Sequence, residues 1–112
     1  MSWRAQGFRA WLLQRLTAIY MVLFLVWFFC ALWINSPADY VEWRTWLGSS
    51  TVAIPVAIFF MALLMHAWVG MRDVIIDYIH VLALRLTLLS IVALSLVYMA
   101  LWVMQVLFRA VL

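Results

Sequence analysis

Charged side chains are scarce in this sequence. Only 10% of its 112 residues are Asp, Glu, Lys or Arg, whereas 71% are hydrophobic, and the mean hydropathy is +1.17. A water-soluble domain of this size needs more polar surface than this to cover itself. The composition therefore excludes a soluble globular protein and predicts an integral membrane chain that forms one domain over residues 1–112.

Other absences exclude further classes of protein. Lysine is missing and the seven arginines are well separated, so no polybasic run is present to bind nucleic acid. One cysteine, Cys30, leaves no intrachain disulfide possible. The sequence has no Cys/His metal cluster, Gly-rich phosphate loop or nucleophile motif, which excludes hydrolase and nucleotide sites of known type.

Three apolar runs are present, over residues 16–34, 52–71 and 86–108; the first and third contain no charged residue, and His66 is the only ionisable group of the second. A helix needs about 20 residues to span a bilayer, so each run is long enough. We expect an all-α integral membrane fold with three transmembrane helices over about residues 16–34, 52–76 and 84–108. The polar segments between them are interpreted as connections, the first with Trp43 and Trp46 at the headgroup level.

Arginine predicts the orientation of these helices. The two sides of the membrane carry unequal numbers of arginines. One side has Arg4, Arg9, Arg15, Arg72 and Arg85, and the other side has Arg44 and Arg109. Cytoplasmic segments carry the excess of basic residues, so the amino terminus and the second connection are predicted to be cytoplasmic. Because no transit-like extension precedes the first span, we expect a bacterial inner membrane.

His66 is the residue most indicative of function, because an ionisable ring at membrane depth is costly unless something binds it. It could be a ligand of haem iron or a proton relay, or it could hydrogen-bond a Ser, Thr or carbonyl on a neighbouring helix. Helical spacing places His66, Gly70, Asp73 and Asp77 within roughly a 60° sector of one face. Gly70, one turn from the imidazole, leaves a notch for a haem or for a packed helix.

Other residues allow both an ordinary and a functional interpretation. Asp77 and Tyr78 could simply end a helix at the interface, or could receive a quinone head group by hydrogen bonding and proton delivery. Arg15 could be a snorkelling cation or a donor to a haem propionate. Arg72 allows the same two interpretations and could pair with Asp73. His80, in the polar connection, is interpreted as a solvated residue, so a second haem ligand must come from another chain.

The motif HAWVGMRDVIIDY, from His66 to Tyr78, closely resembles the His-x3-Gly-x6-Asp-Tyr motif of the succinate dehydrogenase hydrophobic membrane anchor subunit, the D subunit of bacterial complex II. The resemblance extends through most of the chain, to Arg-x-Thr-Ala-Ile at Arg15–Ile19 and Ala-Leu-Arg-Leu at 83–86.

This resemblance implies a membrane-anchor subunit of succinate:ubiquinone oxidoreductase within a heteromeric helix bundle. Its partners would be a cytochrome b556 anchor subunit, an iron–sulfur subunit and a flavoprotein subunit, and FAD and iron–sulfur clusters would belong to the last two. His66 would be one axial ligand of haem b, Tyr78 the hydrogen-bond donor to ubiquinone with Asp77 assisting, and Arg15 a neighbour of the haem propionates. The chain itself would have no activity alone.

Three alternatives stay open from the sequence. The chain could anchor a related quinol:fumarate reductase, or it could be a small helical membrane protein without a cofactor, such as a holin-like oligomer. It could also be an oligomeric proton-coupled transporter with His66 and Asp77 as the relay.

Overall fold

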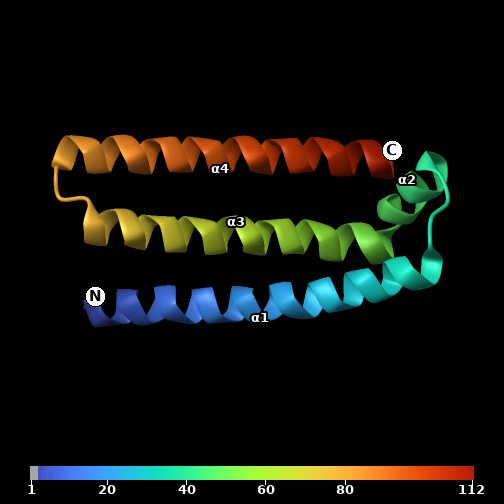
Figure 1. The fold of residues 1–112 in the computed structure, drawn as a ribbon, viewed down its shortest axis with the longest axis horizontal. Helices are drawn as coiled ribbons and strands as arrows, with labels where there is room; N and C mark the ends of the chain where they lie inside the picture. The colour runs from blue at the N-terminus through green and yellow to red at the C-terminus, as the bar shows by residue number, and fades with distance from the viewer. Residues whose placement is uncertain (1–2) are drawn as a thin grey trace.

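A computed structural model describes residues 3–112, with side chains from residue 7 onward. The described chain forms four helices: α1 (Trp3–Asn35), α2 (Tyr40–Gly48), α3 (Ser50–Tyr78) and α4 (Leu82–Val111) (Figure 1). Three segments are long and apolar enough to cross a membrane: Gly7–Asn35, Ser50–Tyr78 and Leu82–Val111. The predicted all-α membrane fold with three spans is confirmed.

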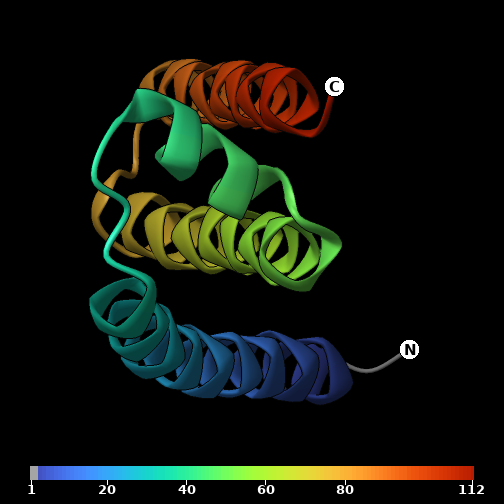
Figure 2. The same cartoon turned by 90° about the vertical axis from the view of Figure 1, so that its right-hand side faces the viewer.

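The long helices form a curved layer with α3 in the middle. α1 and α4 pack against opposite sides of α3, and no close backbone approach joins α1 to α4 in the described chain (Figure 2). α1 and α3 run antiparallel, as do α3 and α4, so the start of α1 and the α3–α4 connection lie at one end. α2 and the carboxyl terminus lie at the other.

The helices are longer than the hydrocarbon layer that they would cross. The molecule extends 51 Å along its long axis, whereas the apolar core of a bilayer is about 30 Å thick. The predicted spans 16–34, 52–76 and 84–108 each lie within one long helix, which continues past the span at both ends. Long arginine side chains near the helix ends allow this, because they reach water while their stems stay in the apolar layer.

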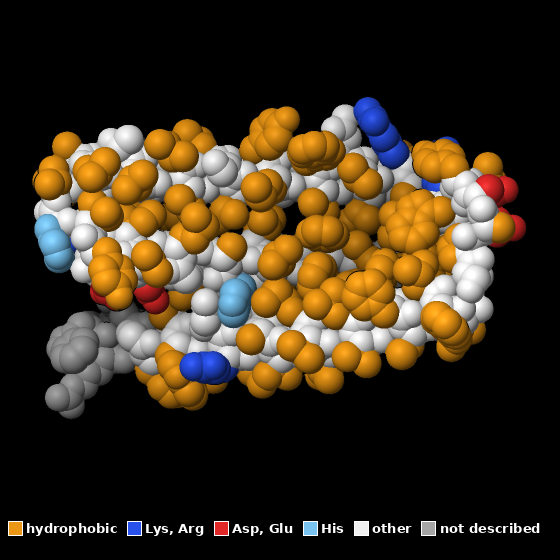
Figure 3. All heavy atoms as spheres, viewed as in Figure 1, with side chains coloured by type: hydrophobic (Ala, Val, Ile, Leu, Met, Phe, Trp, Pro, Cys, Tyr) orange, Lys and Arg blue, Asp and Glu red, His pale blue; other side chains and the backbone are white. Residues whose placement is uncertain are grey.

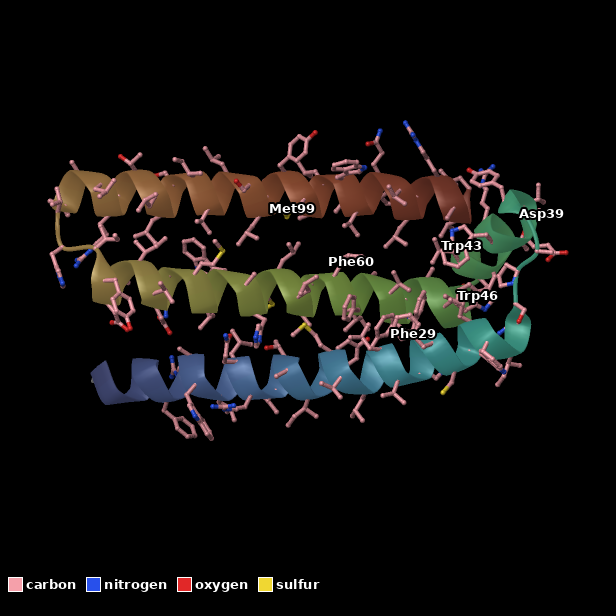
Figure 4. All side chains as sticks on the ribbon, viewed as in Figure 1. Phe29, Asp39, Trp43, Trp46, Phe60 and Met99 are labelled. Carbon is pink, nitrogen blue, oxygen red and sulfur yellow. The ribbon has the colours of Figure 1, made fainter. Side chains whose placement is uncertain are left out.

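The first connection contains α2, a short helix that was not predicted from the sequence. Asp39 is its N-cap: the carboxylate Oδ1 accepts a hydrogen bond from the Glu42 backbone N–H at 2.8 Å. Glu42 in turn accepts from the Ala38 N–H, also at 2.8 Å. Trp46 on α2 turns toward α1, where its ring centroid lies 5.4 Å from that of Phe28. α2 therefore closes the end of the layer rather than merely joining two spans (Figure 4).

An aromatic cluster holds α1 against α3 in the half of the layer next to α2. The rings of Phe24 and Phe59 are stacked with centroids 4.6 Å apart, and Phe24 is buried with Val56. Nearby, the Tyr20 hydroxyl donates to the Pro55 carbonyl at 2.9 Å. Lipid tails are as apolar as these side chains, so the hydrophobic effect does not drive helices together within a membrane. Close packing and interhelical hydrogen bonds stabilise their association instead.

Between α1 and α4, over α3, lies an apolar groove of about 580 Å³. Phe29, Trp43, Phe60 and Met99 are among the residues that line it, one from each of the four helices (Figure 4). The space-filling view shows this hollow on the face turned to the viewer, surrounded by hydrophobic side chains (Figure 3). One face of the layer is thus open toward lipid or toward another membrane chain.

Candidate functional site

His66 lies near the middle of α3, sixteen residues after Ser50 and twelve before Tyr78. Its side chain is half-buried, and it contacts Thr17 on α1. The site is therefore at membrane depth, far from both helix ends, but its ring is open on one side.

The imidazole makes a hydrogen bond across the interface between α3 and α1. Thr17 Oγ1 on α1 lies 3.0 Å from His66 Nδ1, 2.8 Å from the Leu13 carbonyl oxygen and 3.1 Å from that of Gln14. Both carbonyls can only accept, so the hydroxyl proton of Thr17 can go to its own helix, most directly to Leu13. In that arrangement the hydroxyl oxygen accepts from His66 Nδ1–H, and Nε2 keeps its lone pair free. The distances also fit the other tautomer, in which the hydroxyl donates to Nδ1.

This bond is the one expected if the histidine serves packing, and it is equally what a metal-bound histidine needs. A ligating imidazole normally donates its other ring N–H to an oxygen of the protein, which fixes the tautomer and the orientation of the ring. The residues present therefore fit one axial haem ligand, with Thr17 as acceptor for Nδ1–H.

The notch at Gly70 serves helix packing. A Cβ atom placed on Gly70 would lie 3.3 Å from the Gln14 Nε2, so the amide of Gln14 covers this position. Of the two uses considered for the notch, the structure favours the approach of α1. The Gln14 Oε1 is buried and has no hydrogen-bond partner among the described residues.

Arg15 is exposed and does not contact His66. Its guanidinium carbon lies 5.8 Å from the ring centroid of Trp11, one turn earlier on α1, which is a cation–π arrangement. The structure thus brings Thr17 to His66, whereas Arg15, two residues away, faces outward. Its role toward a haem propionate stays a prediction.

Asp77 and Tyr78 form a second, separate place on the molecule. Both are exposed at the carboxyl end of α3, where Tyr78 has 76% of its surface accessible. At 1.5 Å per residue they lie about 17 Å from His66 along the helix axis. The expected ion pair of Arg72 and Asp73 lies between, with 3.3 Å from Nη2 to Oδ1.

Arg85 at the start of α4 holds this end of α3. Its Nε donates to the Ile79 carbonyl at 3.0 Å, and its Nη2 donates to the Ile76 carbonyl at 3.2 Å. These carbonyls belong to the last turn of α3 and its C-cap, which lack partners within the helix. The cation also lies where the negative end of the α3 dipole favours it.

No group of three or more His, Cys, Asp and Glu side chains is placed to bind a metal ion in the described part of the chain. His80 is exposed in the α3–α4 connection.

The sequence matches a protein family over residues 1–104, and that family is described as the succinate dehydrogenase/fumarate reductase transmembrane subunit. The chain belongs to this family. A protein of Coxiella burnetii named succinate dehydrogenase hydrophobic membrane anchor subunit is 30% identical over 105 residues, which cover 94% of this chain and 91% of that protein.

Two Rickettsia proteins with the same name are also similar. The Rickettsia bellii protein is 38% identical over 96 residues, covering 79% of this chain and 70% of its own length. The Rickettsia felis protein is 36% identical over 90 residues, which cover 79% of this chain and 73% of that protein. The resemblance inferred from the motif between His66 and Tyr78 is thereby confirmed at the level of the family: the chain is a transmembrane subunit of this kind, with three apolar helices.

Two residues that the structure connects to these sites were not predicted from the sequence. Thr17 stands in the Arg-x-Thr-Ala-Ile segment, but only the register of α1 against α3 shows that it meets His66. Arg85 was interpreted as a determinant of topology, yet it also caps α3. Its position a few residues after a helix end was an available signal, since basic side chains often bind the last carbonyls of a helix.

Proposed function

We propose that the chain is the hydrophobic membrane anchor of a succinate:ubiquinone oxidoreductase, and that His66 supplies one axial ligand of its haem b. The observation that carries this proposal is the contact of 3.0 Å between Thr17 Oγ1 and His66 Nδ1, because donation from Nδ1–H to Thr17 would leave Nε2 free to bind iron within the α3 span. Membership of the family and the names of the three relatives support the choice of enzyme.

The second haem ligand comes from the cytochrome b556 anchor subunit in this proposal. Two features support such a partner: the open, apolar face between α1 and α4, and the half-exposed ring of His66. The space-filling view shows the hollow on one face of the layer, where a partner could cover it (Figure 3). Arg15 would have to leave its place over Trp11 to bind a haem propionate, and its long side chain makes such a movement feasible.

Haem b, when bound, supplies a one-electron store between the catalytic subunits and the membrane. The chain's own contribution is to hold the imidazole in one tautomer, to exclude water with the α1–α3 interface, and to offer a quinone site at the end of α3. There Tyr78 donates its hydroxyl proton to a quinone carbonyl in a hydrogen bond. Asp77 holds a proton near the same oxygen as the quinone is reduced.

The flavoprotein and iron–sulfur subunits dock on the cytoplasmic side, which holds the start of α1 and the α3–α4 connection. Arg9, Arg15, Arg72 and Arg85 lie toward this end of the layer, and Arg44 and Arg109 lie toward the other, which supports a cytoplasmic amino terminus. Arg4 was part of that count, but its side chain lies outside the described residues. We assign the complex to a bacterial inner membrane.

A quinol:fumarate reductase anchor is the second candidate, because the description of the family includes both enzymes. The direction of catalysis depends on the potentials of the quinone and of cofactors in the partner subunits. Identification of the quinone that copurifies with the complex separates the two: ubiquinone supports the oxidoreductase proposed here, and a low-potential quinone alone supports the fumarate reductase.

The proposal is tested by purifying the chain from its native membrane in mild detergent through a tag at its carboxyl terminus. We expect a flavoprotein, an iron–sulfur protein and a second small membrane protein to copurify in equal amounts, with succinate-dependent ubiquinone reduction. Recovery of the chain alone or as a homo-oligomer, without flavin or haem, would contradict the proposal and favour a cofactor-free helical protein.

A further inference from the structure

We propose that Thr17 is a positioning residue for His66: its hydroxyl fixes the ring in the Nδ1–H tautomer and aims Nε2 away from α1. This inference rests on the proposed function of His66 as a haem ligand. It adds a residue of α1 to a site that otherwise consists of one side chain on α3.

Thr17 is suited to this role by its burial. It is 7% exposed and is the only polar residue that is buried among those whose side chains the structure describes. A hydroxyl in such a position needs partners, and Thr17 has three oxygen or nitrogen atoms within 3.1 Å. The His66 ring is one of them, so the α1–α3 contact at this depth is polar rather than filled by hydrocarbon.

The hydroxyl is also held still. A threonine in a helix populates two χ1 rotamers, because Oγ1 can form a hydrogen bond with a carbonyl of the preceding turn. Here Oγ1 lies 2.8 Å from the Leu13 carbonyl oxygen and 3.1 Å from that of Gln14, so the backbone of α1 fixes its place. The acceptor offered to His66 Nδ1–H therefore has one position, and the imidazole plane follows from it.

The electronic consequence concerns the iron. An imidazole that donates its Nδ1–H to an oxygen becomes a more basic ligand at Nε2. A more basic axial ligand stabilises ferric over ferrous iron and lowers the reduction potential of the haem. Loss of the acceptor should raise that potential and weaken haem binding, whereas a merely structural threonine would leave the potential unchanged.

The chain offers a matched control on another helix. Thr87 Oγ1 donates to the Ala83 carbonyl at 2.7 Å, the same bond to its own helix, but no partner on a neighbouring helix is recorded for it in the described structure. Thr87→Val thus removes the same hydroxyl and the same local bond as Thr17→Val. Thr17→Ser keeps the acceptor and removes only a methyl group.

The experiment uses the whole purified complex, with the variants Thr17→Val, Thr17→Ser, Thr87→Val and His66→Ala. The measurements are the midpoint potential of the haem, its low-spin electron paramagnetic resonance spectrum, and the rate of haem transfer to apomyoglobin. For Thr17→Val we expect a more positive potential, an altered spectrum and haem loss faster by roughly 10- to 100-fold, the usual effect of removing the outer hydrogen bond of a metal ligand. Thr17→Ser and Thr87→Val should match the wild type.

The outcomes separate this inference from the proposed function. If His66→Ala loses the haem spectrum but Thr17→Val keeps the wild-type potential, spectrum and transfer rate, Thr17 has no positioning role and the proposed function stands. If Thr17→Ser is damaged as much as Thr17→Val, the methyl group and not the hydroxyl matters, and the inference is wrong. If His66→Ala keeps the wild-type haem spectrum, the proposed ligand and this inference both fail.

Discussion

Arg85 and Ile79 are joined by a hydrogen bond of 3.0 Å from the arginine Nε to the isoleucine carbonyl oxygen, which ties the first turn of α4 to the end of α3. Asp77 and Tyr78 lie just before that carbonyl. α4 thus holds the exposed end of α3 in place. The position of a residue that binds a quinone at this end would therefore depend on α4.

Replacement of Arg85 by methionine keeps most of the aliphatic stem but removes both hydrogen bonds to α3. A hydrogen bond from a charged donor is worth about 1.5–3 kcal/mol, so the α3 end should loosen. We expect the KM for ubiquinone to rise severalfold while succinate oxidation by a soluble dye stays normal. Arg109→Met, on the last turn of the same helix, is the control. An unchanged KM in Arg85→Met would show that the bond does not support the quinone site.

Replacement of Tyr78 by phenylalanine tests the donor itself. The ring remains and only the hydroxyl is lost, so assembly should be intact and quinone reduction should fall by about tenfold or more, as one hydrogen bond of about 1.5 kcal/mol or more is removed. Dye reduction by succinate should be unaffected. Tyr98→Phe, on the exposed surface of α4, should behave like the wild type in both assays. Equal loss of dye and quinone reduction in Tyr78→Phe would indicate damage to assembly instead.

The three spans could be predicted from the sequence because long apolar runs allow few structures other than helices in lipid. The helix α2 could not be predicted from hydropathy, since nine residues are too short to span and the segment contains charges. Its signal was the pair Asp39 and Glu42, a cap residue followed three positions later by a glutamate. That pattern was available in the sequence and was interpreted only as a polar connection.

The candidate site was predictable only as far as single residues. Spacing on one helix showed that His66 and Gly70 share a face, because the helical period is fixed. It could not show that Gln14 covers Gly70 or that Thr17 meets His66, because the register between two helices depends on side-chain packing along their whole length. Arg15 shows the same limit: its sequence position is next to the site, whereas its side chain lies over Trp11.

Gly48 is the position at which a single methyl group should harm the fold. A Cβ there would overlap the carbonyl group of Ala110, where the end of α2 meets the end of α4. Gly48→Ala should cost roughly 1–3 kcal/mol, the usual effect of inserting a group into a well-packed contact. The measurement is the temperature at which the purified complex loses this subunit. Gly7→Ala, with open space around the new methyl group, should leave that temperature unchanged.

The absorption spectrum of the reduced, purified complex decides whether His66 is a haem ligand. We expect a low-spin b-type spectrum in the wild type and in His80→Ala, and its loss or a clear shift in His66→Ala with the subunits still assembled. A spectrum in His66→Ala identical to that of the wild type would show that His66 does not bind the haem and would leave it as a partner of Thr17 alone.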